Sequence, residues 1–406
     1  MERAGPLSHL TVIEFAGLGP APFAGMMLAD QGARVIRIDR PSKRGGKDGA
    51  MAALTARNSD VLSRGRESIA LDLKQPEARE VALRLIERAD VLIEGFRPGV
   101  MESLGLGPDV CLQRRPKLVY GRVTGWGQTG PLAQAAGHDI NYIALTGALH
   151  STARRGQPPT PTPGLIGDFG GGGMLMAFGV LAAVSQARET GQGQVVDAAI
   201  TDGSALLTAL IHGWRSSGLW NAEAGTNNGD GGAHFYGAYA CADGKYISIG
   251  SMEPQFYALL REKCGLTDPV FDAQWEQRQW PDLKDRVAEV FNQKTRQEWC
   301  GLLEGSDVCF APVLSLDEAA HHPHNEARGT FVSVNGITQP APAPRFSRTP
   351  SSECQPVGLT GAQTRSLLEE FGYSSSEILQ LLANSVVMET TAEPDAQSQA
   401  ARNPER

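Results

Sequence analysis

The sequence predicts an α/β protein made of a large parallel-sheet domain and a smaller α+β domain. Two observations indicate the large domain: short apolar strands alternate with helices through the first 125 residues, and the alternation returns over residues 174–204. Because parallel strands need crossover connections, usually helices, this order is typical of a sheet covered by helices. A third observation, the change to small and polar residues after Leu219, marks the beginning of the second domain.

The strands of the large domain are short apolar runs that end at glycine, proline or charged residues. Its helices are indicated by the helical spacing of apolar residues, by Pro76 in a first turn and by Gly32 after a last turn. The predicted strands are 10–15, 33–39, 91–94, 118–123 and 194–199, and the predicted helices are 23–30, 76–88, 174–188 and one that begins at Thr201.

The second domain follows a predicted linker at residues 221–232. Residues 236–251 alternate like a hairpin around Gly244, and helices are predicted at 253–263 and 283–291. Beyond it, the predicted elements are an extended connector at 339–344 and a helix at 360–370. The predicted domains are 1–220 together with 335–385 for the large one, 225–330 for the small one, and 386–406 as a disordered tail.

Composition and charge exclude several classes of protein. The chain has 406 residues, 41% hydrophobic and 20% charged, which is enough for two domains with substantial cores. Its formal net charge of -8 argues against a nucleic-acid binder. The cysteines never form a C-x-x-C pair, so we interpret them as free thiols in a reducing compartment. They are Cys111, Cys241, Cys264, Cys300, Cys309 and Cys354.

Neither a membrane span nor a targeting segment is predicted. The most apolar stretch, residues 174–184, has about half of the ~20 residues that a bilayer requires. The first ten residues contain neither an apolar signal segment nor an arginine- and serine-rich presequence. We therefore expect a cytoplasmic protein without a membrane partner.

The turn after the first strand invites a dinucleotide-binding interpretation, which we reject. Gly17 and Gly19 are present, but Pro22 stands at the third glycine position and Pro20 removes an amide donor. The acidic residue expected about 20 positions further on is also poorly placed.

Three short polar segments are candidates for chemistry, and each also has a purely structural explanation. His138 and Asp139 stand at the start of a predicted helix, where the aspartate could be only a cap. The free amides there would equally favour a negative charge that develops beside His138. Asp168 stands in a run with four glycines, which indicates either close helix packing or room for a bulky ligand beside a base. Glu253, before Pro254, suits a first helical turn.

Basic residues are concentrated between Arg34 and Lys74. This segment holds ten Lys or Arg against five Asp or Glu, in a chain of net charge -8. Such a cluster is either a solvated face or, on loops at the ends of parallel strands, a site for a polyphosphate. The run 321–324 contains three histidines, but its proline breaks helical spacing and no Cys or Asp partner is near, so we predict no metal site.

Eight segments in this order resemble the α-methylacyl-CoA racemase branch of the class III CoA-transferase (CaiB/BaiF-like) superfamily. The resemblance extends from about Pro6 to Pro350. The segments are ADQGARVIRIDRP (29–41), ADVLIEGFRPGV (89–100), RVTGWGQTGP (122–131), AGHDINYIALTG (136–147), GDFGGGGM (167–174), GQVVDAAITDGS (193–204), MEPQFY (252–257) and APRFSRTP (343–350).

The resemblance implies a Rossmann-like large domain built from both chain ends, a small inserted domain and an interlocked homodimer. It implies active sites between a large domain and the partner's small domain. The implied activity is a racemase that inverts the α-carbon of 2-methylacyl-CoA thioesters by proton transfer through an enolate. Coenzyme A is then part of the substrate, and no separate cofactor is expected.

By the same resemblance, His138 and Asp168 are the two catalytic bases and Glu253 orients and polarises His138. The backbone N–H of Asp139 is the natural stabiliser of the enolate. Residues 42–68 form a longer segment than relatives carry, so which of Lys43, Arg44, Lys47, Arg64 and Arg66 reaches the nucleotide stays open. The residues expected to bind coenzyme A are Arg40, Leu71, Asp72, Leu73, Lys74, Gly95, Arg97, Gly137 and Tyr142.

The alternative activity belongs to the same superfamily. A class III CoA-transferase would use Asp139 as a nucleophile, form a mixed anhydride and pass coenzyme A to a second acid. Transferases usually have tyrosine before that aspartate, whereas His138 stands here, which favours the racemase. We expect Asp139→Ala to spare much activity in a racemase and to abolish it in a transferase. The acyl group stays open, and we expect the Met- and Gly-rich residues 170–176 to provide an adaptable apolar surface for it.

Overall fold

The computed structural model describes residues 4–41 and 60–390. They form two compact units, one of Met1–Tyr142, Pro163–Leu206 and Phe331–Arg406, the other of Ile143–Thr162 and Leu207–Thr330. The sequence placed 143–162 and 207–220 in the large domain, whereas both belong to the second unit. One reason is a close backbone contact: a Cβ on Gly225 would lie 2.2 Å from the amide nitrogen of Arg155.

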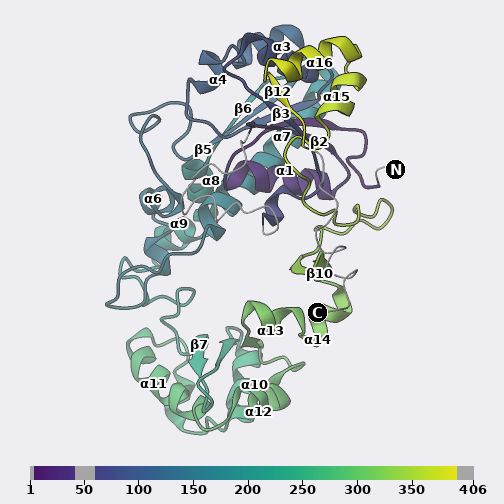
Figure 1. Ribbon diagram of the computed structural model, residues 1–406. Coiled ribbons are helices and arrows are strands. Elements are labelled where there is room, and N and C mark those ends of the chain that lie inside the picture. Colours follow the sequence, from purple (N-terminus) through teal and green to yellow (C-terminus); the bar gives the residue numbers. More distant parts are fainter. Residues whose placement is uncertain (1–3, 42–59, 391–406) are drawn as a thin grey trace, which may run out of the picture. The chain divides into compact units, whose positions relative to one another are not determined.

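The first unit contains a mixed, mostly parallel sheet (Figure 1). Its seven strands lie in the order β12-β3-β2-β1-β4-β5-β6. Only β12 is antiparallel. Strand β3 was not predicted, because Arg66 and Glu67 interrupt its apolar pattern. The strands are β1 Thr11–Phe15, β2 Arg34–Asp39, β3 Arg66–Leu71, β4 Val91–Glu94, β5 Val119–Thr124, β6 Val195–Ala199 and β12 Val387–Met388.

Strand β1 lies where the order of the sheet reverses. It pairs in parallel with β2 and with β4, so that Val12 lies opposite Val35 on one side and Val91 on the other. The carboxyl ends of parallel strands meet at one edge of the sheet, and ligands bind at that edge beside the strand where the order reverses. The fold therefore directs attention to the loops that follow β1 and β4.

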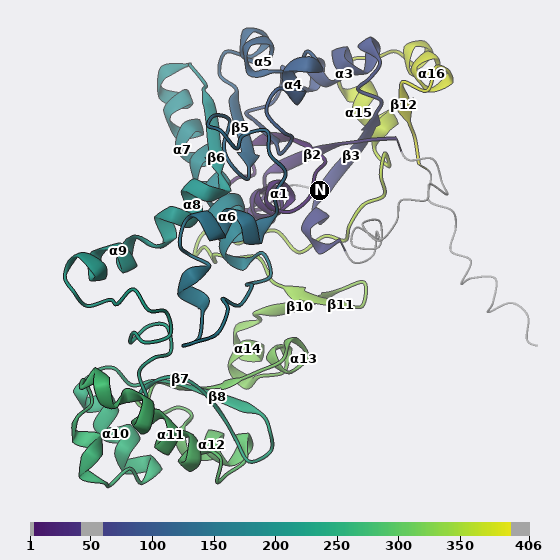
Figure 2. The ribbon, with the colours of Figure 1, turned by 90° about the vertical axis from the view of Figure 1, so that its left-hand side faces the viewer.

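Helices cover both faces of this sheet (Figure 2). Val12 packs in one core with Leu28 of α1 and Val180 of α7, whereas Ile13 packs in the other core with Leu85 of α3. Successive residues of a strand point to opposite faces, so neighbouring residues supply different cores. The covering helices are α1 Pro20–Asp30 and α7 Leu175–Thr190 on one face, and α3 Pro76–Ile86, α5 Pro108–Arg114, α15 Thr364–Glu370 and α16 Ser375–Ala383 on the other.

The C-terminal part of the sheet corrects the prediction of a disordered tail for residues 386–390, and the rest of the predicted tail, 391–406, lies outside the described residues. Val386 and Val387 are buried, and Val387 lies opposite Leu71 in the β12–β3 pair. Helix α16, also missed, begins with a capping box in which Ser374 and Glu377 bond each other's backbone amides. These residues are recruited because β3 would otherwise be an open edge of the sheet.

The helix after Gly164 is longer than predicted. A π-helix, η3 Leu165–Met174, continues directly into α7, so residues 165–190 form one helix, not one that begins at 174. By length and composition alone it could cross a membrane. In the fold it packs on β5 and β6 through buried residues such as Met176 and Val180, as a helix covering a sheet does.

The second unit contains an antiparallel sheet in the order β7-β8-β9, and its first two strands form the predicted hairpin. Its core includes the aromatic rings of Phe235, Phe291 and Trp299. The main elements are β7 Tyr236–Ala240, β8 Tyr246–Gly250, β9 Phe310–Val313, α10 Pro254–Cys264, α11 Trp280–Phe291 and α12 Arg296–Leu303.

The predicted linker at 221–232 is an organised loop. The carboxylate of Asp230 accepts the backbone amides of Gly225, Asn227 and Gly232. The shorter elements are η1 Val61–Ser63, α4 Val100–Ser103, α6 Asp139–Leu145, η2 His150–Thr152, α8 Ile200–Leu207, α9 Ala209–Ser216, η4 Pro269–Asp272, η5 Gln277–Gln279, α13 Leu316–Ala320, α14 Pro323–Arg328, β10 Phe331–Val334 and β11 Ile337–Pro340.

Candidate active site

A cavity of about 220 Å³ lies in the first unit at the carboxyl ends of β1, β4, β5 and β6. His138 and Asp168, which come from different elements, both line it. It therefore brings together the two proposed bases at the edge where this kind of sheet binds ligands. The other lining residues are 18–20, 95–98, 123–126, 133, 135–137, 142 and 200.

His138 lies directly before α6, and its loop is held from both sides. The side chain of Asn141 accepts the backbone N–H of His138, and the hydroxyl of Tyr142 donates to the carbonyl of Gly137. A Cβ on Gly125 would lie 2.0 Å from the ring of Tyr142, and one on Gly137 would lie 2.7 Å from it. Tyr142 and Gly137 thus position the histidine in addition to lining the cavity.

Asp168 projects from the π-helix, and the surrounding glycines allow that helix to lie close to its neighbours. A Cβ on Gly203 of α8 would lie 1.9 Å from the carbonyl oxygen of Gly171, and one on Gly173 would lie 2.6 Å from the ring of Phe23 in α1. The close packing expected of the glycine run is therefore confirmed, and Asp168 in this run lines the cavity. Room for a bulky ligand beside it stays a prediction. π-helical turns are rare and concentrate at functional sites.

The carboxyl of Asp168 is held in a partly protonated range. Burial, and next the charge of Asp139, raise its pKa to about 6, and His138 acts in the opposite direction. The same Asp139 carboxylate accepts the backbone N–H of Asp168 at 2.9 Å. Gly19 lies next to this carboxyl group, because a Cβ there would lie 3.1 Å from the Oδ2 atom of Asp168.

Two expected site residues are not among those that line the cavity. Asp139 is not among the residues that line the cavity, since its carboxylate turns to the backbone of Asp168. Glu253 is the N-cap residue of α10 in the second unit, where it is exposed and makes no capping bond through its side chain. Its expected interaction with His138 stays a prediction.

The residues expected to bind coenzyme A follow neighbouring parallel strands. Arg40 comes directly after β2, Leu71 ends β3, and Arg97 follows β4, so all three lie at the carboxyl edge of the sheet. Leu71 is buried in the core, which leaves only its backbone to offer a ligand. Arg79 donates hydrogen bonds to the carbonyl oxygens of residues 73 and 74 and thereby fixes the segment that follows Leu71. Of this set, only Gly95, Arg97, Gly137 and Tyr142 line the cavity.

Two of the five candidates for nucleotide contact in the basic cluster are structural, which corrects part of the prediction. Arg64 is buried and pairs with Asp30 at 2.6 Å, and Arg66 is buried and pairs with Glu14 at 3.0 Å. Both guanidinium groups are therefore paired in the interior of the fold and do not contact the nucleotide. The other three candidates, Lys43, Arg44 and Lys47, lie outside the described residues.

The acyl surface expected at residues 170–176 is smaller than predicted. Met176 is fully buried and packs against Gly121 of β5, where a Cβ would lie 2.6 Å from its sulfur atom. Met174 is about half exposed. Of the two methionines, only Met174 is exposed enough to contact an acyl chain directly.

Residues 7–363 match CoA-transferase family III. The chain belongs to this family. It is 43% identical over 385 residues to the alpha-methylacyl-CoA racemase of Mus musculus, covering 94% of this chain and 97% of the relative. The protein of the same name from Homo sapiens is 42% identical over the same shares. The structure is similar to that of a CAIB/BAIF family protein from Brucella suis, with a TM-score of 0.77 over 91% of this chain and 100% of the other. At 23% identity this likeness concerns the fold alone.

The family expectation is therefore confirmed, and the structure adds residues that sequence reasoning missed. Gly19 lies opposite Asp168 in the turn that we examined only for a dinucleotide pattern. Its positive φ of 70° and the adjoining carboxylate explain a glycine there. Glu94, the buried last residue of β4, was considered only as part of an apolar strand. A charged residue at the carboxyl end of a buried strand could have been singled out.

Among the described residues, no group of three or more His, Cys, Asp or Glu is arranged to hold a metal ion. Within the three-histidine run, His322 bonds Glu304 at 2.8 Å and His321 approaches Glu326 at 3.7 Å. The six cysteines are free thiols. The absence of a metal or cofactor requirement stays a prediction.

Proposed function

We propose that this protein is an acyl-CoA racemase that inverts the α-carbon of 2-methylacyl-CoA thioesters. The observation that carries the proposal is the single cavity lined by both His138 and Asp168, with the pKa of Asp168 held at about 6. Inversion requires removal of a proton from one face of a carbon and delivery to the other. An imidazole and a carboxyl of raised pKa, facing one cavity, are suited to that exchange.

In one direction, neutral His138 removes the α-proton and the C–H electron pair passes into the enolate. Protonated Asp168 then donates its proton to the opposite face of the carbon, which leaves the imidazolium and the carboxylate. The opposite epimer reverses every step, with Asp168 as the base. The raised pKa matters because a carboxyl of ordinary pKa would almost never be protonated at neutral pH.

The enolate oxygen needs a hydrogen-bond donor. Asp139 begins α6, so its backbone N–H belongs to the first turn, whose amides have no acceptor within the helix. We assign this amide to the thioester oxygen, with a contribution of about 3 kcal/mol by analogy with an oxyanion-hole donor. Glu253 is proposed to orient His138 for the same step.

Coenzyme A is proposed to bind as part of the substrate at the carboxyl edge of the sheet. Arg40 and Arg97 would contact its phosphates, while the backbone of residues 71–74 would bind its base and ribose. Binding energy from this remote part of the substrate positions the reacting carbon. No separate cofactor is required by this chemistry.

The alternative, a CoA-transferase with Asp139 as nucleophile, is less well supported. The carboxylate of Asp139 already accepts the amide of Asp168. A nucleophile would have to leave that bond and turn toward the thioester. The racemase uses only the backbone N–H of Asp139 and leaves the bond in place.

We further propose an interlocked homodimer located in the cytoplasm. Large apolar side chains are exposed on three consecutive helices, as expected for surfaces that a second copy covers. They include Phe178 of α7 at 72%, Leu206 of α8 at 64% and Leu210 of α9 at 62% exposure. Sedimentation should therefore give twice the monomer mass of 43.3 kDa.

The activity is tested with one stereoisomer of a 2-methylacyl-CoA in deuterated water. Deuterium should enter the α-position while both epimers accumulate, and His138→Ala or Asp168→Ala should abolish both. His324→Ala, on the exposed part of α14, is the matched control and should retain full activity. Transfer of coenzyme A to an added carboxylate without α-exchange would instead establish the transferase.

A further inference from the structure

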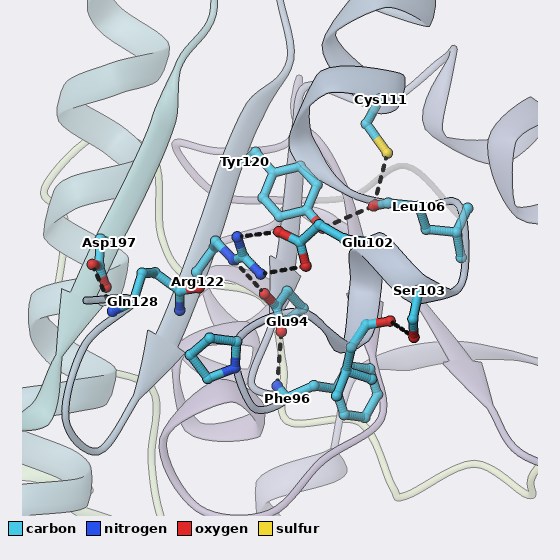
Figure 3. Close-up of polar contacts among 12 residues, drawn as sticks. Glu94, Phe96, Glu102, Ser103, Leu106, Cys111, Tyr120, Arg122, Gln128 and Asp197 are labelled. Carbon is cyan, nitrogen blue, oxygen red and sulfur yellow. Dashed lines mark hydrogen bonds and ion pairs between the residues drawn. The ribbon is translucent and has the colours of Figure 1, made fainter. Parts of the chain in front are cut away.

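The loop of residues 95–101 is attached at both ends to one guanidinium group. It begins after Glu94, the last residue of β4, and ends before Glu102 in α4. The Nε atom of Arg122 donates to Glu94 at 2.7 Å, and its Nη1 and Nη2 atoms donate to Glu102 at 2.8 and 3.2 Å (Figure 3). Arg122 therefore joins the two ends of the loop.

The first end of the loop is fixed by a buried carboxylate. Glu94 is fully buried, and while one of its oxygens accepts from Arg122, the other accepts the backbone N–H of Phe96 at 2.7 Å (Figure 3). The bond to an amide two residues further on sets the direction in which the chain leaves the strand. Glu94 and Arg122 also lie opposite each other in the β4–β5 pair, so the sheet itself aligns them.

The second end is anchored beyond α4. The carbonyl oxygen of Leu106 accepts the hydroxyl of Tyr120 at 2.9 Å and the thiol of Cys111 at 3.2 Å (Figure 3). Tyr120 is buried on β5, two residues before Arg122. The loop consequently leaves the sheet at β4 and returns to side chains of β5.

The loop carries residues 95–98 along the rim of the cavity, with Arg97 among them. Arg97 and Glu102 are exposed, whereas Glu94 and Arg122 are buried. A buried ion pair adds little stability compared with apolar residues of the same size. Its main consequence here is geometric, because it fixes the backbone on either side of a cation at the mouth of the site.

We infer that Arg122, together with Glu94 and Glu102, positions Arg97 to bind a phosphate of the acyl-CoA substrate. The inference rests on the proposed function, since it takes the ligand to be a coenzyme A thioester. None of the three residues touches the reacting atoms, so they act on substrate affinity through the loop. Loss of the attachment should raise KM and leave kcat nearly unchanged.

The test measures the affinity of the full chain for free coenzyme A by calorimetry, and KM and kcat in the exchange assay. Glu102→Gln is the variant of choice because the side chain of Glu102 is 45% exposed, so the substitution does not bury a new polar group. Glu80→Gln is the matched control: Glu80 is also 45% exposed and pairs with an arginine, Arg114, at 2.8 Å. Arg97→Ala and the double variant Glu102→Gln/Arg97→Ala complete a cycle.

We expect Arg97→Ala to weaken coenzyme A binding about tenfold to hundredfold, as for loss of a charge-assisted hydrogen bond. Glu102→Gln should weaken it about threefold to tenfold, with kcat within about twofold and an unchanged unfolding midpoint, and Glu80→Gln should have no effect. In the double variant the effect of Glu102→Gln should vanish, because Arg97 is no longer there to be positioned.

Two results would overturn the inference while leaving the proposed function intact. One is normal coenzyme A affinity in Glu102→Gln when Arg97→Ala is weakened. The other is a double variant in which the two effects multiply. Failure of the unsubstituted protein to bind coenzyme A would refute the proposed function as well.

Discussion

Replacing Asp139 by asparagine separates the two roles that the structure combines in this residue. Asparagine keeps an oxygen that can accept the amide of Asp168, a bond of 2.9 Å, and removes the negative charge. That charge is the second cause, after burial, of the raised pKa of Asp168. The substitution should therefore lower this pKa without moving the backbone of the π-helix.

The size of the effect is bounded by the order of the causes. The pKa of Asp168 rises from 3.8 to about 6, and burial accounts for the largest part of the rise. Asp139→Asn should then lower it by less than burial raises it, and we take a fall of about one pH unit as the working value. At pH 7, a carboxyl of pKa 6 is protonated in about one molecule in ten, and one of pKa 5 in about one in a hundred. Activity at pH 7 should fall by up to about tenfold.

The assay is the pH profile of kcat/KM for α-exchange between pH 4.5 and 8.5. The loss in Asp139→Asn should be largest at pH 7 and above and should nearly vanish toward pH 4.5, because the carboxyl of Asp168 gives up the proton that it must donate at a lower pH. Asp139→Ala should show the same dependence on pH and a further loss at every pH, since the amide of Asp168 loses its acceptor. This replaces the expectation that Asp139→Ala spares much activity. A loss of equal size at every pH, or no loss at pH 7, in Asp139→Asn would refute the electrostatic reasoning, and complete loss of activity would favour the transferase.

Three further predictions concern the framework around the site. Burial lowers the pKa of His234 from 6.5 to about 4, so the unfolded chain binds more protons than the folded chain between these pH values. Urea titrations should therefore show the free energy of unfolding falling by about 3 kcal/mol from pH 6.5 to 4. The fall should be much smaller in His234→Gln. Glu14→Gln should lower the free energy of unfolding by about 3–5 kcal/mol, because it leaves the buried Arg66 without its ion pair. The double variant Glu14→Gln/Arg66→Met should recover part of that loss in thermal unfolding. Equal losses in the single and the double variant would contradict the pairing. Gly203→Ala should destabilise the protein by about 1–3 kcal/mol and lower kcat, because its Cβ would displace the π-helix that carries Asp168; a fully active, equally stable variant would show that the close contact is unimportant.

Local patterns in the sequence determined much of the first unit and, in the second unit, the β7–β8 hairpin and the helices α10 and α11. The strands β1, β2, β4, β5 and β6 were predicted within one or two residues, because buried parallel strands are short apolar runs with clear breaks. The hairpin of the second unit followed from alternation around Gly244. The candidate bases His138 and Asp168 also came from local segments, and the structure brings both to one cavity.

Only the tertiary structure decided what the charged residues do. Arg64 and Arg66 belong to a basic cluster in the sequence, yet each is buried against a carboxylate 34 or 52 residues away, Asp30 and Glu14. Asp139, weighed as a cap or a nucleophile, bonds the backbone of a residue 29 positions further on. Strand formation depends mainly on neighbours in the chain, whereas the role of a charged side chain depends on what folding places within a few ångströms of it. The reason is that a buried ionised group is stable only when it is paired.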